Sequence, residues 1–309
     1  MRIDIEAWAP EYGAPIDTET LAPTGADVDI DVELPAADWR PLDAGEVDAA
    51  RRIAFVDGVR RIDARVWVTH DDGTTRMGIC ASFAAGLVRC DGPSARILAA
   101  EVRRGLFTTA GAPHLETRAG TYHAFATASD DIDKLSQGLQ ERMAILERDV
   151  AATFMGDAAS ADTLIVLDGP LTGKLDLTGA VGYVKTHRVA YLPQEASDVI
   201  ARLAPSQRSP LFVTQGAWSR YSWYLRLENA GGHPWAGVVR CEATAELALP
   251  DARNLADRTA RSLPRFASAP HKDPRAPQNL YPIGGLEREL RRRLGDAGLI
   301  YRSLRTAAL

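Results

Sequence analysis

Two apolar runs in this sequence end in Asp-Gly, and each places one carboxylate where it could take part in chemistry. Asp57 closes the run IAFVDG, and Asp168 closes the run TLIVLDG. A glycine after the aspartate leaves an open backbone beside the side chain, so the carboxylate can project from the end of a strand. One Asp-Gly pair alone is more typical of a turn. Two apolar strands with the same ending favour carboxylates that act together, for example as ligands of a hard divalent cation.

The stretch TLIVLDGPLTGK also invites comparison with a phosphate-binding loop. A Walker A loop has four residues between its two glycines, and its lysine is followed by a Ser or Thr that holds magnesium. Here Gly169 and Gly173 enclose three residues, and Lys174 is followed by Leu175. Both defects argue against a Walker A loop, so the chemistry of this stretch rests with Asp168.

The segment from Asp131 to Phe154 predicts a helix that carries a third carboxylate. Its apolar residues recur at steps of three and four: Ile132, Leu135, Leu139, Met143, Leu146, Val150 and Phe154. At about 100° per residue, Glu147 lies about 40° from Met143 and therefore inside this apolar stripe, whereas Glu141 faces solvent. A carboxylate on the packed face needs a partner, which is either a metal ion or an arginine at the edge of the core.

The order of the elements predicts an α/β fold with an RNase H-like mixed sheet flanked by helices. Segments 52–58, 61–70 and 77–90 have strand patterns between turn signals, as in a three-stranded antiparallel meander. Residues 94–107 are expected to form a helix, and residues 163–169 a central strand that is covered on both faces. An aspartate on the first strand, a glutamate on a helix and an aspartate on a later central strand are the layout of an RNase H-like nuclease core.

The chain is expected to form one nuclease domain preceded by an extended arm. Residues 1–45 are rich in Pro, Asp, Ala and Thr and predict the arm, whereas residues 46–309 predict the domain. Helical additions are expected in its C-terminal part, at 251–263 and at 285–296, and Gly295 ends the second of them.

The composition limits which cellular location and which classes of binding partner are expected. The formal net charge is −5, which argues against a protein coated in basic surface but leaves room for a local DNA groove or for bound cations. Three scattered cysteines without a CxxC pair argue against a disulfide framework or a zinc site. No apolar run reaches the roughly 20 residues that span a bilayer, and the N-terminal residues lack the pattern of a signal peptide. A cytoplasmic protein without a membrane partner is expected.

Five motifs, in their order along the chain, resemble the NurA family of DNA-end-processing nucleases. They are FVDG, LQERMAILERDVA, LIVLDGPL, GYVKTH and NLYPIGGLE, and the resemblance runs from Arg51 to Gly295. The family implies an RNase H-like fold, a homodimer, and manganese-dependent exonuclease and single-strand endonuclease activity on DNA ends. It also implies a partner, a HerA-type hexameric DNA-translocating ATPase, during the end resection of double-strand breaks.

The resemblance also assigns roles to individual residues. Asp57 matches the metal ligand on the first strand, Asp168 the ligand on the later strand, and Glu147 the glutamate on the helix. These three would hold Mn²⁺ or Mg²⁺, with two ions expected. Lys185 in GYVKTH matches a basic position suited to a DNA phosphate, with an ordinary exposed lysine as the alternative. Tyr281 in NLYP falls near the family's C-terminal tyrosine and is counted among the catalytic residues.

The chain departs from the family pattern after Tyr281. The family typically has a histidine several residues further on, whereas this chain reads IGGLERELRRR. Arg291 and Arg292 are therefore candidates to contact phosphate, with a solvated helix face as the alternative. The missing histidine leaves two hypotheses. One is a metal-dependent deoxyribonuclease, and the other is a non-catalytic or weakly active adaptor that binds the hexameric ATPase.

Overall fold

The computed structural model describes most of the chain. The described residues are 22–307 apart from 24, 70–72, 110, 159–161, 172–176, 188, 217, 229–233 and 274. Lys174 of the rejected phosphate loop and residues 1–21 of the expected arm lie outside them. Among the described residues, no helix combines the length and the apolar character that crossing a membrane requires.

The chain folds into two compact units. Unit 1 contains the described residues of 1–55, 90–95 and 157–284, and unit 2 those of 56–89, 96–156 and 285–309. Strand β4 (Arg52–Thr69) contributes its first residues to unit 1 and the rest to unit 2. Each unit has a hydrophobic cluster of its own.

Unit 1 is built on a mixed sheet. In sheet order its main strands are β2 (Asp27–Asp29), β13 (Phe212–Gln215), β14 (Arg220–Arg226), β15 (Val238–Thr244), β10 (Ala180–Val184) and β9 (Thr163–Asp168). β9 and β10 run parallel, whereas β15 runs antiparallel to both β10 and β14. The four central residues of β9 are buried, which confirms the continuous apolar strand predicted for this segment.

Short strands and helices complete unit 1. They are β1 (Ala22–Pro23), η1 (Ala36–Asp38), β3 (Leu42–Asp43), β11 (Val189–Ala190), α2 (Gln194–Ala201), β12 (Gln207–Arg208), α3 (Leu249–Ser262) and η3 (Pro264–Phe266). α3 packs against β14, where the buried indole of Trp223 donates a hydrogen bond to Thr259 Oγ1 at 3.1 Å. α2 contributes Val199 and Ile200 to the hydrophobic cluster of this unit.

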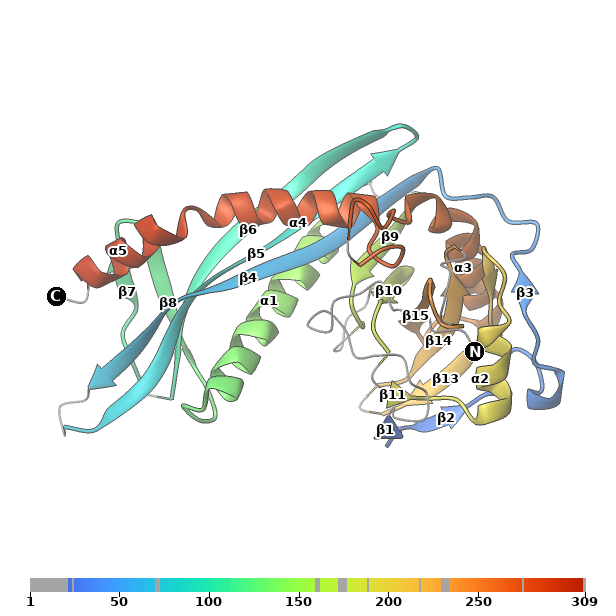
Figure 1. Ribbon diagram of the computed structural model, residues 1–309, viewed down its shortest axis with the longest axis horizontal. Coiled ribbons are helices and arrows are strands. Elements are labelled where there is room, and N and C mark those ends of the chain that lie inside the picture. Colours follow the sequence, from blue (N-terminus) through green and yellow to red (C-terminus); the bar gives the residue numbers. More distant parts are fainter. Residues whose placement is uncertain are drawn as a thin grey trace. The chain divides into compact units, whose positions relative to one another are not determined.

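Unit 2 is built on long strands. β4 is followed by β5 (Thr75–Asp91), β6 (Ser94–Thr108), β7 (Leu115–Thr117) and β8 (Gly120–Ala126), in the sheet order β4-β5-β6-β8-β7. The helices of this unit are α1 (Ile132–Met155), the part of α4 (Tyr281–Leu294) from Gly285 onward, and α5 (Ala297–Ala307). Figure 1 shows α4 and α5 running along these strands on one side and α1 on the other.

The helices pack where glycines leave room in the strands. On α4, Leu286 and Leu290 lie where a β-carbon on Gly86 of β5 would be in tight contact with them. On α1, Met143 lies similarly against Gly58 of β4. A larger residue at either glycine would push a helix off the sheet, so these two positions set how closely the layers approach.

The long helix predicted from hydrophobic periodicity is confirmed as α1. Six of its seven expected apolar positions are buried, and only Ile132, in the first turn, is 40% exposed. Glu141 is exposed, as its position opposite the apolar stripe predicts.

The helix predicted for residues 94–107 is wrong. These residues lie in β6, between β5 and β8 in the sheet. The connection after β5 contains Gly92, whose φ of +56° permits a tight turn that returns the chain beside β5. Pairing along the 15 residues of β6 then outweighs the helix propensity of a run that contains Leu, Ala, Glu and Arg.

The predicted boundaries of the meander are wrong as well. Segments 52–58 and 61–70 are not separate strands, because β4 continues through Asp57 and Gly58 as far as Thr69. The third strand of the meander is β6 instead. Gly58 therefore makes no turn, and its role is to admit α1.

The predicted mixed sheet flanked by helices is confirmed. β9 and β10 run parallel and β15 antiparallel in unit 1, and in unit 2 β6 runs parallel to β8. The expected C-terminal helices are also present: α3 covers residues 249–262, and α4 ends at Leu294 just before Gly295, whose φ is +86°. α5 is a further helix that the sequence analysis did not predict.

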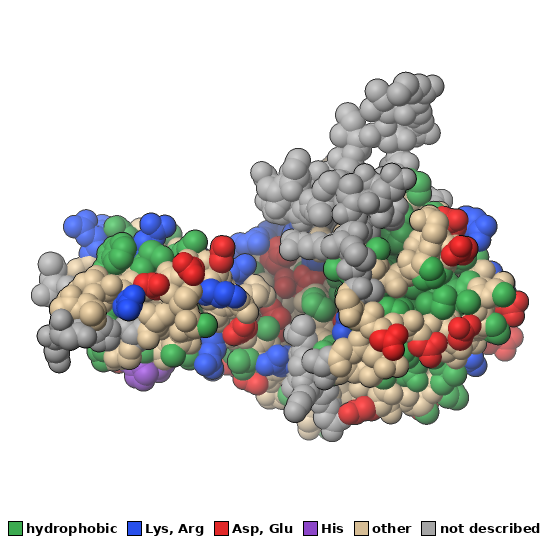
Figure 2. All heavy atoms as spheres, turned by 90° about the horizontal axis from the view of Figure 1, so that it is seen from below, with side chains coloured by type: hydrophobic (Ala, Val, Ile, Leu, Met, Phe, Trp, Pro, Cys, Tyr) green, Lys and Arg blue, Asp and Glu red, His purple; other side chains and the backbone are tan. Residues whose placement is uncertain are grey.

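Charges of both signs are interspersed on the surface. Figure 2 shows Lys and Arg side chains as well as Asp and Glu side chains on the face drawn there, and neither sign covers it. This distribution fits the small negative net charge of the sequence, and it leaves recognition of an anion to local clusters.

Candidate metal and phosphate site

Asp57 is a buried carboxylate in the interior of a strand. It is 6% exposed, and its Oδ1 accepts a hydrogen bond of 2.7 Å from the backbone N–H of Gly58. The sequence analysis placed it at a strand end, but β4 continues for twelve residues beyond it, to Thr69. An acidic group within a long paired strand is held more rigidly than one in a turn, which suits a metal ligand.

Glu287 on α4 is the carboxylate that lies beside Asp57 in unit 2. One oxygen of each lies within 4.8 Å of the other, and Glu287 is also 6% exposed. Arg291, one turn later on α4, reaches it with Nη1 at 3.4 Å from Oε2. Two carboxylates this close and this buried repel each other when both are charged, so a cation between them would stabilise the pair.

The sequence analysis missed Glu287, although a signal was present. Ile283, Leu290 and Leu294 lie at positions −4, +3 and +7 relative to it, and all three are buried. Glu287 therefore belongs to the apolar stripe of α4, just as Glu147 belongs to that of α1. The same test that selected Glu147 would have selected Glu287.

Glu147 lies against Gly58. Its Oε1 occupies the space that a β-carbon on Gly58 would need. Because neighbouring residues of a strand point to opposite faces, Gly58 faces Glu147 while the Asp57 side chain is directed to the other face. The role of Glu147 as a metal ligand stays a prediction.

Asp168 ends β9 in unit 1. Gly169 follows with a φ of +100°, a conformation that glycine adopts without strain, and the chain leaves the strand there. Asp168 Oδ2 accepts a hydrogen bond of 2.5 Å from Lys185 Nζ. Its Oδ1 is buried and has no hydrogen-bond partner among the described residues. A buried carboxylate oxygen without a donor has the capacity to bind a cation.

Lys185 follows β10 and is held by two acceptors. Its ammonium donates to Asp168 Oδ2 at 2.5 Å and to Asn279 Oδ1 at 2.9 Å. The side chains of Lys185 and Asp168 are each 12% exposed. The alternative of an ordinary exposed lysine is therefore wrong.

Asn279 connects Lys185 to a second acidic residue. Its Nδ2 donates to Asp273 Oδ2 at 2.6 Å. Burial acts to raise the pKa of Asp273, but the hydrogen bonds from Asn279 and from the Arg275 backbone, together with the Arg275 charge, hold that pKa below its usual range. Asn279 of the NLYP motif had no role predicted from the sequence, because Lys185 lies 94 residues earlier.

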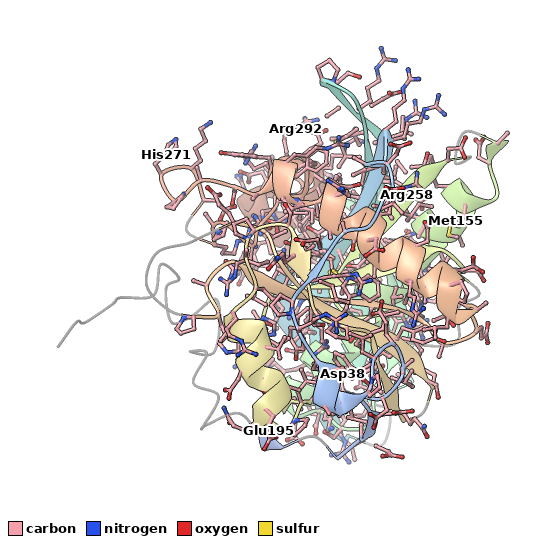
Figure 3. All side chains as sticks on the ribbon, turned by 90° about the vertical axis from the view of Figure 1, so that its right-hand side faces the viewer. Asp38, Met155, Glu195, Arg258, His271 and Arg292 are labelled. Carbon is pink, nitrogen blue, oxygen red and sulfur yellow. The ribbon has the colours of Figure 1, made fainter. Side chains whose placement is uncertain are left out.

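The remaining candidates lie on α4 and its preceding loop. Tyr281 is 42% exposed, and its hydroxyl accepts a hydrogen bond from the Ala269 backbone N–H at 3.2 Å. The Lys272 ammonium lies 5.3 Å from the centroid of its ring. In Figure 3, His271 projects outward on the loop that precedes α4. This surface therefore presents one positive group, Lys272, beside an aromatic ring.

Arg291 and Arg292 are exposed but engaged with acidic neighbours. Arg291 pairs with Glu287, and Arg292 makes two hydrogen bonds of 2.8 Å with Glu289. The pair of Arg292 with Glu289 lies near the surface and contributes little stability, so the Arg292 guanidinium can turn to a phosphate. The Arg291 guanidinium is exposed as well, but the Glu287 carboxylate that it contacts is buried.

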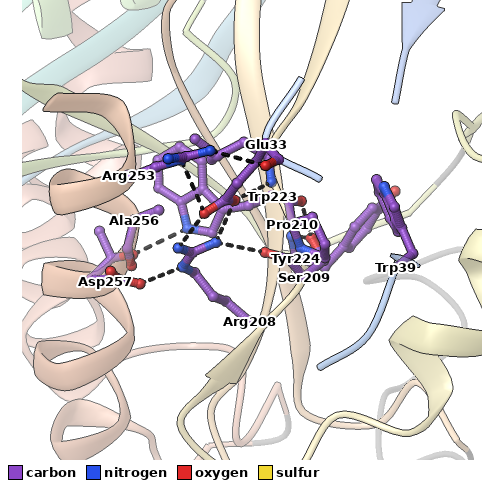
Figure 4. A network of polar contacts seen from close by, with 12 residues as sticks. Glu33, Trp39, Arg208, Ser209, Pro210, Trp223, Tyr224, Arg253, Ala256 and Asp257 are labelled. Atoms are coloured by element: carbon purple, nitrogen blue, oxygen red, sulfur yellow. Dashed lines mark hydrogen bonds and ion pairs between the residues drawn. The ribbon is translucent and has the colours of Figure 1, made fainter. Parts of the chain in front are cut away.

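A second cluster of buried charges in unit 1 is fully satisfied internally. Figure 4 shows Arg208 between Glu33 and Asp257, with hydrogen bonds of 2.8 and 2.9 Å to Glu33 and 2.6 Å to Asp257. Burial acts to raise the pKa of Glu33, but the hydrogen bond and charge of Arg208 lower it below its usual value. All three nitrogens of the Arg208 guanidinium are hydrogen-bonded to protein acceptors, so this arginine stabilises the fold.

The acidic donors of each unit suit a hard divalent cation. Asp57 and Glu287 in unit 2, and Asp168 in unit 1, offer carboxylate oxygens, which Mg²⁺ and Mn²⁺ prefer over softer ligands. Asp168 is paired with Lys185. A cation bound to Asp168 would therefore compete with the ammonium for one oxygen while using the other.

Comparisons with known proteins find similarity to solved structures. No family model matches the sequence, and no curated protein matches it. Among solved structures, the crystal structure of the NurA nuclease from Sulfolobus solfataricus is similar over 87% of this chain and 88% of that chain, with a TM-score of 0.46 and 12% sequence identity. Its name is that of the family which the sequence motifs resemble.

Proposed function

We propose that this chain is a metal-dependent nuclease of the NurA type that hydrolyses phosphodiester bonds at DNA ends. The observation that carries the proposal is the pair of buried carboxylates, Asp57 and Glu287, with oxygens within 4.8 Å of each other. A cation bound between the two carboxylates would offset their mutual repulsion and stabilise the folded protein.

Asp168 is the third metal ligand in this proposal. It lies at the end of β9 in unit 1. Its Oδ1 is buried without a hydrogen-bond partner among the described residues. We propose that Asp57 and Glu287 of unit 2 hold Mn²⁺ or Mg²⁺, with Asp168 as the further ligand that the sequence motifs assign and a second ion as part of the proposal.

Each remaining residue of the site acts on DNA in this proposal. A bound divalent cation lowers the pKa of a water molecule and offsets charge on the phosphate. Lys185 holds a non-bridging phosphate oxygen. Arg291 and Arg292 contact phosphates further along the strand, and Tyr281 stacks on a base or positions the cleaved end.

The direct test measures cleavage of end-labelled single-stranded and blunt duplex DNA with Mn²⁺, Mg²⁺ or EDTA. Asp57→Asn, Glu287→Gln and Asp168→Asn should each lower the rate by about a hundredfold or more, because each removes a charged ligand of the catalytic metal. Glu141→Gln removes an exposed carboxylate of α1 and should leave the rate unchanged. Equal rates in the wild type and all three site variants would refute the assignment.

The second candidate function is a non-catalytic adaptor for a HerA-type hexameric ATPase. It is favoured by the absence of a histidine after Tyr281 and by the exposed basic end of α4. This adaptor would co-elute with the ATPase in size-exclusion chromatography and leave DNA intact with either metal. Light scattering on the purified chain tests the proposed homodimer.

A further inference from the structure

The amide of Asn279 has only one orientation that satisfies its neighbours. On one side lies the Asp273 carboxylate, which accepts a hydrogen bond of 2.6 Å. On the other side lies the Lys185 ammonium, which donates one of 2.9 Å. A carboxylate requires the NH₂ group and an ammonium requires the oxygen, so Asp273 fixes which end of Asn279 faces Lys185.

Asp273 is itself fixed by its own loop. Its Oδ1 accepts a hydrogen bond of 2.8 Å from the Arg275 backbone N–H, and the Arg275 guanidinium lies 3.5 Å away. Asn279 is fully buried. The three residues thus form a rigid chain of polar contacts that ends at Lys185.

The base of this loop is tied to the strands below it. An isolated β-bridge joins Ala267 to Leu280. The buried hydroxyl of Tyr183 on β10 donates a hydrogen bond of 2.7 Å to the carbonyl of Gln278. This hydrogen bond joins Gln278, the residue before Asn279, to β10, the strand before Lys185. It therefore helps to fix the distance between the Asn279 amide and the Lys185 ammonium.

The ammonium of Lys185 has three N–H donors, and the described residues accept two of them. An acceptor for the third must come from outside these residues. The two present acceptors differ in character, because Asp168 is a carboxylate that a metal would claim, whereas Asn279 is neutral and remains.

We infer that Asn279 is the positioning residue of Lys185: it keeps the ammonium at the site when Asp168 turns to a cation, so that the ammonium can hold a phosphodiester oxygen. This inference rests on the proposed nuclease function and names the group that would recognise the DNA backbone. Without Asn279, a Lys185 side chain released by Asp168 would be flexible, and its charge would no longer be held at the site.

The first test measures how readily the Lys185 amine is acylated in the absence of DNA and metal. Acylation of lysines by acetic anhydride is followed by mass spectrometry, with the exposed Lys134 as internal reference. Asn279→Ala should raise the relative rate at Lys185 about tenfold, which corresponds to losing one charge-assisted hydrogen bond. The control is Gln278→Ala, which removes a neighbouring amide whose side chain makes no hydrogen bond in the described structure.

An exchange variant separates positioning from general damage to the loop. Asp273→Asn combined with Asn279→Asp keeps the net charge and reverses the hydrogen bond between the two side chains. The carboxylate at 279 then still accepts from Lys185, so acylation should stay near the wild-type rate. Equal acylation of Lys185 in Asn279→Ala and in the Gln278→Ala control would overturn the inference, provided that both melt at the wild-type temperature.

The second test measures binding of a fluorescent single-stranded oligonucleotide in EDTA by anisotropy. Lys185→Ala and Asn279→Ala should each weaken binding about tenfold, and the double variant no further, because both remove the same contact. Independent, multiplying effects would contradict a positioning role. Cleavage of DNA by the wild type is recorded alongside. If the wild type cleaves DNA but Asn279→Ala does not change the acylation of Lys185, the nuclease function stands and the inference about Asn279 is wrong. If the wild type neither binds nor cleaves DNA, both the nuclease function and the inference are wrong.

Discussion

An oxygen of the Glu147 carboxylate fills the space in which a β-carbon on residue 58 would lie, so Gly58 and Glu147 determine each other. The same β-carbon would lie 2.9 Å from Met143 Cγ and 3.1 Å from the Ala84 carbonyl oxygen. The side chains of α1 can shift, but the Ala84 backbone cannot do so without disturbing β5. The glycine of the Asp57-Gly58 pair thus marks a position where α1 packs closely against β4.

We predict that Gly58→Ala lowers the free energy of unfolding by about 1–3 kcal/mol, the usual cost of overpacking a core. Urea denaturation measures this change. Gly111→Ala is the matched control, because a β-carbon there would meet nothing within 4 Å. Equal stability of the two variants would show that α1 lies further from β4 than described.

Removal of the buried guanidinium in Figure 4 should be far more costly than removal of an exposed one. Arg208→Met leaves the carboxylates of Glu33 and Asp257 without their cation, and we expect a loss of about 3–5 kcal/mol. Arg51→Met, at a side chain that is 83% exposed and 3.6 Å from Asp91, should cost less than about 0.5 kcal/mol. Denaturation curves of the two variants give the comparison directly.

His187 should make the stability of the protein depend on pH. The pKa of this imidazole is lowered from its ordinary 6.5 to about 4, chiefly by burial; the hydrogen bond to the Val238 carbonyl acts against this shift, and the nearby Arg240 charge acts with it. Below pH 6.5 the imidazole of residue 187 is mostly protonated in the unfolded chain, whereas in the folded chain it stays mostly neutral down to about pH 4. Stability contributed by neutral His187 is therefore complete above pH 6.5 and falls by about 2 kcal/mol between there and pH 5.

His187→Phe tests this source of the pH dependence. The variant keeps an aromatic ring beside Tyr224 and Trp235 and removes the titrating group. Urea denaturation at pH 7 and pH 5 should then show a difference that is smaller by about 2 kcal/mol than in the wild type. An unchanged difference would assign the pH dependence to other groups.

Binding of a divalent cation should stabilise the folded chain through its acidic site. Mn²⁺ at a hundred times its dissociation constant should add about 2.7 kcal/mol to the free energy of unfolding, if it binds only the folded state. Glu287→Gln should remove most of this gain, because it removes a ligand beside Asp57. Glu289→Gln, two residues further along the same helix, is the control. Thermal melts with and without Mn²⁺ provide the readout.

The sequence predicted those parts of the fold that depend on local pattern. Seven apolar positions in α1 were enough to find the helix and to orient Glu147 and Glu141 around it. The apolar run that ends at Asp168 likewise identified β9 as a central strand. These features depend on neighbours within one or two turns, which a single sequence contains.

What the sequence analysis missed depends on contacts between distant segments. The residues of β6 carry a helix-compatible pattern, and only pairing with β5 and β8 makes them a strand. Asn279 gains its role from Lys185, which lies 94 residues earlier. Glu287 gains its role from Asp57 on a strand far away in the sequence. No local pattern encodes which of several glutamates will meet a given aspartate.

The pairing of Lys185 with Asp168 means that the chain supplies its own cation to one of its acidic residues. In small metallo-domains whose folding free energy comes from metal binding, a chelator that removes the metal unfolds the chain. Here the protein should stay folded but inactive during purification and storage in EDTA. Addition of Mn²⁺ or Mg²⁺ should then start the proposed cleavage of DNA without a refolding step.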